Sequence, residues 1–176
     1  GQMQNIRHFW SSIRPNGPKR PLILDRLELR VCDFVSDINL LLAITALLEI
    51  RILNLFENLQ TLDPLNSSIF SLDELSEICD QNEIEAAKNS LNAELVNWKD
   101  GKKVICREWI KNLLEDLSPT AEKLKMNHLL KPIYEVLEKG NQSMKWIKQY
   151  EKGLSIQEIM QCAIEDMIKT EEKGIL

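Results

Sequence analysis

Several features that mark common classes of enzyme are missing from this chain of 176 residues. Its six glycines form no glycine-rich loop of the kind that cradles phosphates. Its four cysteines lie far apart and include no Cys-x-x-Cys pair, which fits neither a zinc site nor a small disulfide scaffold. Because of this spacing, the cysteines are predicted to be reduced, buried thiols in a cytoplasmic protein. No Ser-His-Asp order and no pair of catalytic carboxylates can be identified either.

Long apolar runs and a positive charge balance are also absent. The net charge of −5 and the pI near 5.2 argue against a nucleic-acid partner or an anionic membrane surface. Residues 2–10 lack the apolar core of a secretory signal. The most apolar run, residues 40–48, is shorter than the roughly 20 residues that a membrane-spanning helix needs. This run is therefore predicted to be buried core rather than a membrane span.

The strongest pattern that is present lies in residues 22–33, which predict a β-strand. Apolar and polar residues alternate strictly there, so successive side chains fall on opposite faces. One face carries Leu27, Leu29 and Val31, and the other carries Arg26, Glu28, Arg30 and Cys32. Three prolines and a glycine at residues 15–21 predict a shaped loop before the strand. No partner strand is evident, so we expect this strand to be covered by helices or to pair with a second copy in a homodimer.

Almost everything after this strand is predicted to be helical. Ser36 or Asp37 is the expected N-cap of a helix that reaches about residue 59. The first half of this helix is apolar nearly all round, so it is expected to be enclosed on most sides. Further helix starts are predicted at Ser71, Asn82, Ser118, Pro132 and Ser155. The predicted fold is mainly α with one N-terminal β-strand, with a loop and strand in residues 1–35 and a helical region in residues 36–176.

The polar face of the strand is the candidate site. Two arginines beside a carboxylate could hold a divalent metal and an anionic substrate side by side. A solvated strand face with cross-strand charge pairing explains the same pattern about as well. For His8 and Trp10, packing within the loop is the more common role of such residues.

A family resemblance covers nearly the whole chain. It is carried by His8-x-Trp10-x-x-x-Arg14-Pro15, by residues 26–33 (Arg-Leu-Glu-Leu-Arg-Val-Cys-Asp) and by the Ser36-Asp37 helix start. Asn82-x-x-x-Ala86-Ala87, Arg107-Glu108-Trp109 and Lys139-Gly140-Asn141 extend it into the tail. These motifs resemble the glutamate–cysteine ligase family of the carboxylate–amine ligase type, its cyanobacterial branch in particular. The similarity is to the carboxy-terminal portion of that family's longer sequence, and the strand also resembles a strand of glutamine synthetase.

The resemblance implies a glutamine-synthetase-like α+β catalytic domain and a defined chemistry. The implied reaction is the ligation of the glutamate γ-carboxylate to cysteine through an acyl phosphate, in glutathione biosynthesis, with ATP and Mg²⁺. By the same resemblance Glu28 would be a metal ligand, and Arg30 and Arg14 would be catalytic. Substrate and nucleotide would be bound by Arg26, Arg30, Trp10 and His8.

The partners expected on this interpretation are glutamate, cysteine and the missing N-terminal part of the same enzyme. One strand cannot supply all the carboxylates that two or more cations need, so the isolated chain is expected to be inactive. The alternative is a non-catalytic helical protein-interaction module whose charged strand is incidental.

Overall fold

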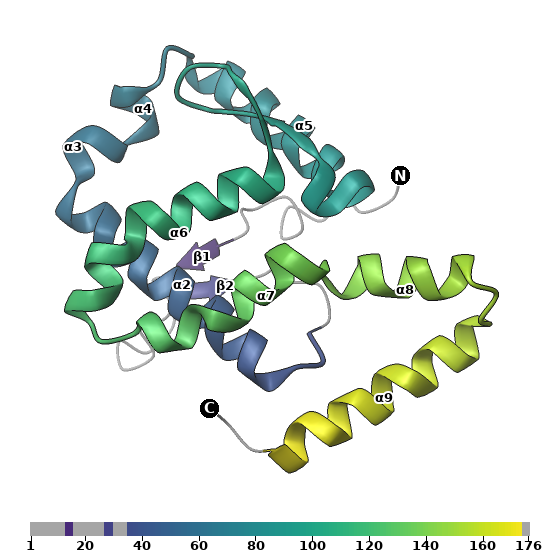
Figure 1. Cartoon of the computed structure of the whole chain (residues 1–176). Coiled ribbons are helices and arrows are strands. Elements are labelled where there is room, and N and C mark those ends of the chain that lie inside the picture. The colour runs from purple at the N-terminus through teal and green to yellow at the C-terminus, as the bar shows by residue number, and fades with distance from the viewer. Residues whose placement is uncertain (1–12, 16–26, 30–34, 174–176) are drawn as a thin grey trace. The chain divides into compact units, whose positions relative to one another are not determined.

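The computed structural model describes residues 13–15, 27–29 and 35–173, and the chain divides into two units, Gly1–Val35 and Ser36–Leu176. Figure 1 shows that helices make up most of the second unit. The described residues also form two small antiparallel sheets, each of two strands. The prediction of a mainly helical fold is therefore confirmed, and the prediction of a single strand is wrong.

The first sheet pairs β1 (Ile13–Pro15) with β2 (Leu27–Leu29). The prediction of strand at residues 27–29 is confirmed, but the expectation that it has no partner in the chain is wrong. The partner strand β1 is not predictable from the sequence, because only Ile13 and Arg14 precede the proline that ends it. Proline is tolerated there because a strand end needs no further N–H donor. Since β2 is paired within the chain, the argument for a homodimer through this strand no longer holds.

The second unit begins with α2 (Ile38–Glu57), as predicted. Its N-cap is Asp37, whose carboxylate accepts hydrogen bonds from the backbone N–H groups of Asn39 at 2.9 Å and Leu40 at 3.4 Å. The expectation that this helix is enclosed on most sides is wrong. One side is buried, through Ala43, Ala46 and Ile50. Outside that side, α2 leaves large apolar side chains exposed, among them Leu41, Leu42 and Phe56.

Among the described residues, α2 is the one helix long and apolar enough to cross a membrane. The core helix of a soluble protein passes the same test of length and composition. Because one face of α2 packs on the rest of the unit, its apolar character is partly explained by burial.

The hydrophobic core lies between α2, α6 (Cys106–Lys123) and α7 (Lys131–Lys139), with the short η3 (Asn127–Leu130) beside them. Its buried members include Ile50, Leu114, Leu117, Ala121, Leu130, Ile133 and Leu137. Two polar contacts also join α2 to α6. Asn54 Nδ2 donates to Thr120 Oγ1 at 3.3 Å, and Lys123 pairs with Glu57.

After α2 the chain makes two short helices, α3 (Leu59–Leu62) and α4 (Pro64–Ser67), and then the long α5 (Leu72–Asn89). The capping box predicted at Ser71 is confirmed, with Glu74 as its acidic member. The helix start predicted at Asn82 is wrong because α5 runs through that residue. The short η2 (Ser90–Asn92) follows, and then a hairpin of β3 (Glu94–Val96) and β4 (Lys103–Ile105).

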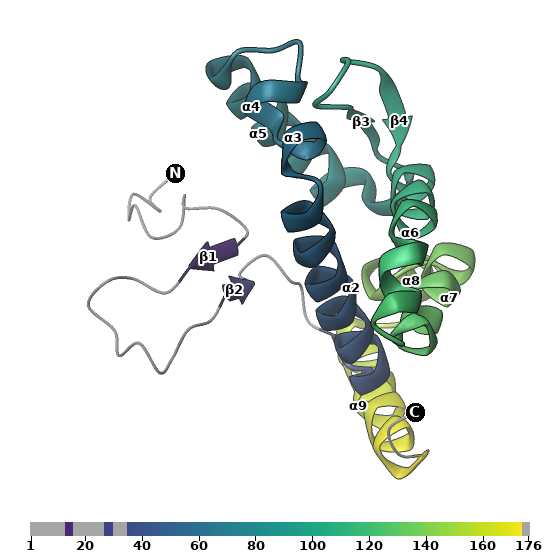
Figure 2. The same cartoon turned by 90° about the vertical axis from the view of Figure 1, so that its left-hand side faces the viewer.

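The remaining elements are α8 (Gln142–Glu151) and α9 (Ile156–Lys173). The helix predicted to begin at Ser118 is instead the last part of α6, which continues through Pro119. The helix predicted from Pro132 to Gly140 is confirmed as α7. The capping box at Ser155 is also confirmed, since Ser155 and Glu158 exchange backbone and side-chain hydrogen bonds. Figure 2 shows α9 at one end of this unit, beyond the lower part of α2.

Candidate functional site

The first sheet brings together two of the residues that the sequence singled out. In the register of β1 and β2, Arg14 lies directly opposite Glu28. The two residues are Cα partners of the antiparallel pair, which is a relation of backbone register. An arginine and a glutamate from different strands are thus paired in the sheet. Arginine and carboxylate together are a combination suited to a phosphate and the cation that accompanies it.

The other predicted site residues lie outside the described part of the chain. These are His8, Trp10, Arg26 and Arg30. Their roles stay predictions. The pairing of Arg14 with Glu28 was not anticipated from the sequence, because a strand of three residues is too short to show an alternating pattern.

A magnesium site needs more oxygen ligands than Glu28 alone can supply. Within residues 13–15, 27–29 and 35–173, no group of three or more His, Cys, Asp or Glu side chains could hold a metal ion. The role of Glu28 as a metal ligand therefore stays a prediction.

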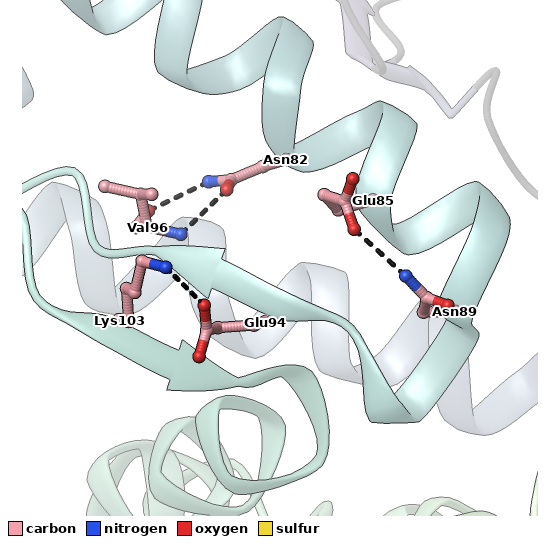
Figure 3. Close-up of polar contacts among 6 residues, drawn as sticks. All are labelled: Asn82, Glu85, Asn89, Glu94, Val96 and Lys103. Atoms are coloured by element: carbon pink, nitrogen blue, oxygen red, sulfur yellow. Dashed lines mark hydrogen bonds and ion pairs between the residues drawn. The ribbon is translucent and has the colours of Figure 1, made fainter.

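The tail motif that begins at Asn82 has a structural role. The Asn82 side chain bridges from α5 to β3, where its Nδ2 donates to the Val96 carbonyl and its Oδ1 accepts from the Val96 N–H (Figure 3). Figure 3 also shows Lys103 of β4 paired with Glu94 of β3, across the two strands. These contacts fix the hairpin on α5 and leave no side chain of the group directed at a common ligand.

The motif Lys139-Gly140-Asn141 likewise forms a joint between helices. Gly140 ends α7 with a φ of +89°, and Asn141 is the N-cap of α8, accepting from the Met144 N–H at 3.0 Å. Asn141 Nδ2 also donates to Ser90 Oγ at 2.6 Å. Asn82 and Asn141, from two of the tail motifs, therefore hold helices and strands together.

Three of the cysteines lie in the described part of the chain. Cys79 is free and exposed, and Cys106 and Cys162 are free and half-buried, so the prediction of buried thiols is wrong for these three. Burial raises the pKa of Cys79, with a further contribution from Glu83 and Asp80, and burial also raises the pKa of Cys106 against a smaller opposing effect of Arg107. A thiol with a raised pKa carries little thiolate at neutral pH, so neither Cys79 nor Cys106 has the character of a nucleophile.

An apolar depression of about 250 Å³ lies on the outward side of α2. It is lined by Thr45, Leu48, Glu49, Ile52 and Leu53, all from this one helix. A nucleotide or amino-acid site needs several convergent polar groups. Glu49 is the one charged residue in this lining, so the depression is not a substrate site.

Comparison with known protein families gives one result. The model of glutamate–cysteine ligase family 2 matches residues 1–170. No curated protein and no solved structure matches the chain. Because the family match covers nearly the whole length, this chain belongs to the glutamate–cysteine ligase family, whose members are ligases. The resemblance found in the sequence is confirmed at the level of the family.

Proposed function

We propose that this chain is part of a cytoplasmic, cyanobacterial-like ligase that joins the γ-carboxylate of glutamate to the amine of cysteine at the expense of ATP. Family membership supports the reaction class. The observation that supports the proposal for named residues is the register of the first sheet, in which Arg14 and Glu28 are paired positions. Chemistry of this class, which makes γ-glutamylcysteine for glutathione synthesis, needs both residue types in one place.

The proposed reaction has two steps. A γ-carboxylate oxygen of glutamate attacks the γ-phosphorus of ATP, the bond to the bridging oxygen breaks, and ADP leaves. The cysteine amine then attacks the carbonyl carbon of the acyl phosphate. The C–O bond to phosphate breaks, the amine loses a proton, and an amide and inorganic phosphate result. Negative charge is concentrated on the transferred phosphoryl group throughout, so cationic groups must surround it.

The roles of the individual residues follow from their charges. Glu28 would be one ligand of Mg²⁺, which would supply positive charge to offset the negative charge of the phosphates. Arg14 and Arg30 would neutralise the transferred phosphoryl group, because a guanidinium can hold two of its oxygens at once. Arg26, with Trp10 and His8 in the preceding loop, would bind glutamate or the nucleotide.

The exposed side of α2 supports a larger catalytic domain. This side carries Leu41, Leu42, Leu53 and Phe56, which are between 36% and 69% exposed. A helix that backs a sheet buries such a face against it, and soluble proteins rarely leave so much contiguous apolar surface in water. We expect further strands of the same enzyme, in a glutamine-synthetase-like arrangement, to cover this face and to contribute the remaining metal ligands.

The test uses the longest natural form of the protein, with Mg²⁺, ATP, glutamate and cysteine. γ-Glutamylcysteine is measured by mass spectrometry, and ADP by a coupled assay. Glu28→Gln is expected to lower the rate by about 100-fold or more and to raise the Mg²⁺ concentration required, because a metal ligand is weakened. The matched control is Glu138→Gln, which changes an exposed carboxylate on α7 and should leave the rate unchanged.

Two results would contradict the proposal. One is a Glu28→Gln enzyme as active as the control, and the other is a long form without any ligase activity under these conditions. The 176-residue chain by itself is expected neither to hydrolyse ATP nor to make γ-glutamylcysteine. Binding of a protein partner by an inactive long form would instead favour the alternative of a helical interaction module.

A further inference from the structure

The connection between β3 and β4, residues 97–102, holds the one Asp-Gly pair in the sequence, Asp100-Gly101. This connection is called here the hairpin tip. Glycine has no side chain to shield its backbone nitrogen, so in a flexible chain this nitrogen readily attacks the side-chain carbonyl of a preceding aspartate. Asp100 is exposed to solvent. The reactivity of the pair therefore depends on how the hairpin tip holds these two residues.

We propose that Asp100-Gly101 is a site of spontaneous isoaspartate formation, and that the closed hairpin tip limits the rate of this modification. In the first step the Gly101 nitrogen attacks Cγ of the protonated Asp100 carboxyl group. A C–N bond forms, and the hydroxyl group leaves as water with the amide proton. In the second step water adds to the α-carbonyl carbon of the resulting succinimide, and the bond from that carbon to nitrogen breaks. The main chain then runs through the former side chain, with no net change in composition.

The attacking nitrogen is engaged in the folded chain. The Gly101 N–H donates to the Asn97 carbonyl at 2.9 Å, and the Asn97 N–H donates to the Lys102 carbonyl at 2.8 Å. These two hydrogen bonds close the hairpin tip. The Gly101 nitrogen cannot approach the Asp100 side chain while its hydrogen is held by the Asn97 carbonyl. The reaction therefore requires the tip to open, which costs both hydrogen bonds.

The Asp100 carboxyl group is held in its unreactive form by Lys102. Asp100 Oδ1 accepts from the Lys102 N–H at 3.1 Å, and Asp100 Oδ2 lies 2.8 Å from Lys102 Nζ. Hydrogen bonds from the Lys102 side chain and backbone lower the pKa of Asp100, because they favour the ionised form. The carboxylate is a much poorer electrophile than the acid, since its oxygen cannot leave as water without a further proton. Lys102 thus reduces the fraction of Asp100 that can react.

A second segment of the chain keeps the hairpin tip closed. Ser68 Oγ donates to the Trp98 carbonyl at 2.6 Å and accepts from the Phe70 N–H at 3.0 Å. The Phe70 ring lies directly against Gly101, since a Cβ at Gly101 would be only 2.9 Å from Phe70 Cζ. Both contacts must be disturbed when the tip opens. They therefore slow the modification without touching the Asp100 carboxyl group.

The test does not depend on the ligase reaction. The full chain is aged at mildly acidic pH, and the same chain unfolded in urea is the reference. Isoaspartate has the mass of aspartate, so it is identified by its separate elution in peptide mapping and by labelling with an isoaspartyl methyltransferase. Isomerisation at Asp100 should be at least about tenfold slower in the folded chain, because two hydrogen bonds must break first.

Two variants address the two effects separately. Ser68→Ala should raise the rate in the folded chain about fivefold, as expected for the loss of one hydrogen bond. Its matched control is Ser67→Ala, because the Ser67 hydroxyl makes no hydrogen bond within the described part of the chain. Lys102→Met should raise the rate about two- to fivefold, as expected for an exposed ion pair. Its control is Lys99→Met, an exposed lysine of the hairpin tip that forms no ion pair with the described residues.

Three results would overturn the proposal. Absence of isoaspartate at Asp100 in the unfolded chain would show that the pair is not a site of this modification. Equal rates in the folded and unfolded chains would show that the hairpin tip gives no protection. Equal rates in each variant and its control would show that Ser68 and Lys102 do not set the rate. Lys102→Met changes an exposed side chain, so it tests the proposal even if Ser68→Ala does not fold.

Discussion

The Asn82 side chain binds both backbone groups of Val96, as a neighbouring strand would. Its Nδ2 donates to the Val96 carbonyl at 2.9 Å, and its Oδ1 accepts from the Val96 N–H at 2.8 Å (Figure 3). β3 is thus held on one side by β4 and on the other by a side chain of α5. Without this side chain, the Val96 backbone groups on that side lose their protein partner.

Asn82→Ala should therefore lower the free energy of unfolding by about 1–3 kcal/mol, the cost of leaving half-buried polar groups unpaired. Urea unfolding followed by circular dichroism measures the change. Asn89→Ala is the matched control, because Asn89 bonds the side chain of Glu85 on the exposed surface of the same helix and should change stability by less than about 0.5 kcal/mol. Equal effects at both positions would show that the bridge to Val96 contributes nothing.

Asn82 also illustrates what could be predicted from the sequence. The capping boxes at Ser71 and Ser155 were correctly predicted because both partners of each lie within one turn of helix. Asn82 has a similar local pattern, which predicts a helix start. Its partner Val96 lies on another element, however, and Asn82 lies inside α5. The same limit applies to Arg14 and Glu28, whose pairing depends on strand register rather than on local spacing.

The exposure of α2 could not be predicted for a related reason. Composition identifies an apolar helix, but the number of neighbours that cover it is a property of the tertiary fold. Only one side of α2 finds partners among α6, α7 and η3. At the candidate site, the residue types and the strand were predictable, whereas the identity of the partner strand was not.

Pro119 lies inside α6, where the sequence suggested a helix start. Proline cannot donate the helical hydrogen bond to the carbonyl four residues earlier, and its ring crowds that carbonyl. Pro119 is exposed, so replacing it removes no core contact. Pro119→Ala should raise the free energy of unfolding by about 1–3 kcal/mol, measured by urea unfolding. A loss of stability would mean that the native α6 gains more from Pro119 than the missing hydrogen bond costs.

Gly140 and Gly153 both have positive φ, at +89° and +94°, but differ in their surroundings. A Cβ at Gly140 would lie 3.4 Å from Met144 Cβ and Sδ, whereas a Cβ at Gly153 would meet nothing within 4 Å. Alanine at either position carries backbone strain of about 1–3 kcal/mol. Gly140→Ala should be the more destabilising in thermal unfolding, because it also disturbs the start of α8.

The two capping boxes predict a dependence of stability on pH. Hydrogen bonds from the Ser71 side chain and backbone lower the pKa of Glu74, and those from the Ser155 backbone and side chain lower the pKa of Glu158. A carboxylate with a lowered pKa stabilises the folded state above its ordinary pKa, near 4.5, and this contribution is lost as the pH falls through the lowered value.

Stability should therefore fall as the pH drops below about 4.5, and this fall should be smaller in Glu74→Gln and Glu158→Gln than in the native chain. Both carboxylates are exposed, so each effect is small and best resolved by comparing unfolding midpoints at pH 7 and pH 3.5. Glu138→Gln, outside the capping boxes, is the control. If the pH dependence of stability is unchanged in the variant that carries both substitutions, the titration of Glu74 and Glu158 does not cause the fall in stability.

Exchanging the charges of Arg14 and Glu28 separates a structural role of this pair from a catalytic one. Each single change, Arg14→Glu or Glu28→Arg, places like charges opposite each other and should cost about 0.2–1 kcal/mol of stability. The double variant restores opposite charges, so its unfolding midpoint should return to the native value. Ligase activity of the long form should nevertheless stay at least about 100-fold below native, because a metal ligand and a phosphoryl-binding cation have changed places. Recovery of activity along with stability would show that the pair serves only to hold β1 against β2.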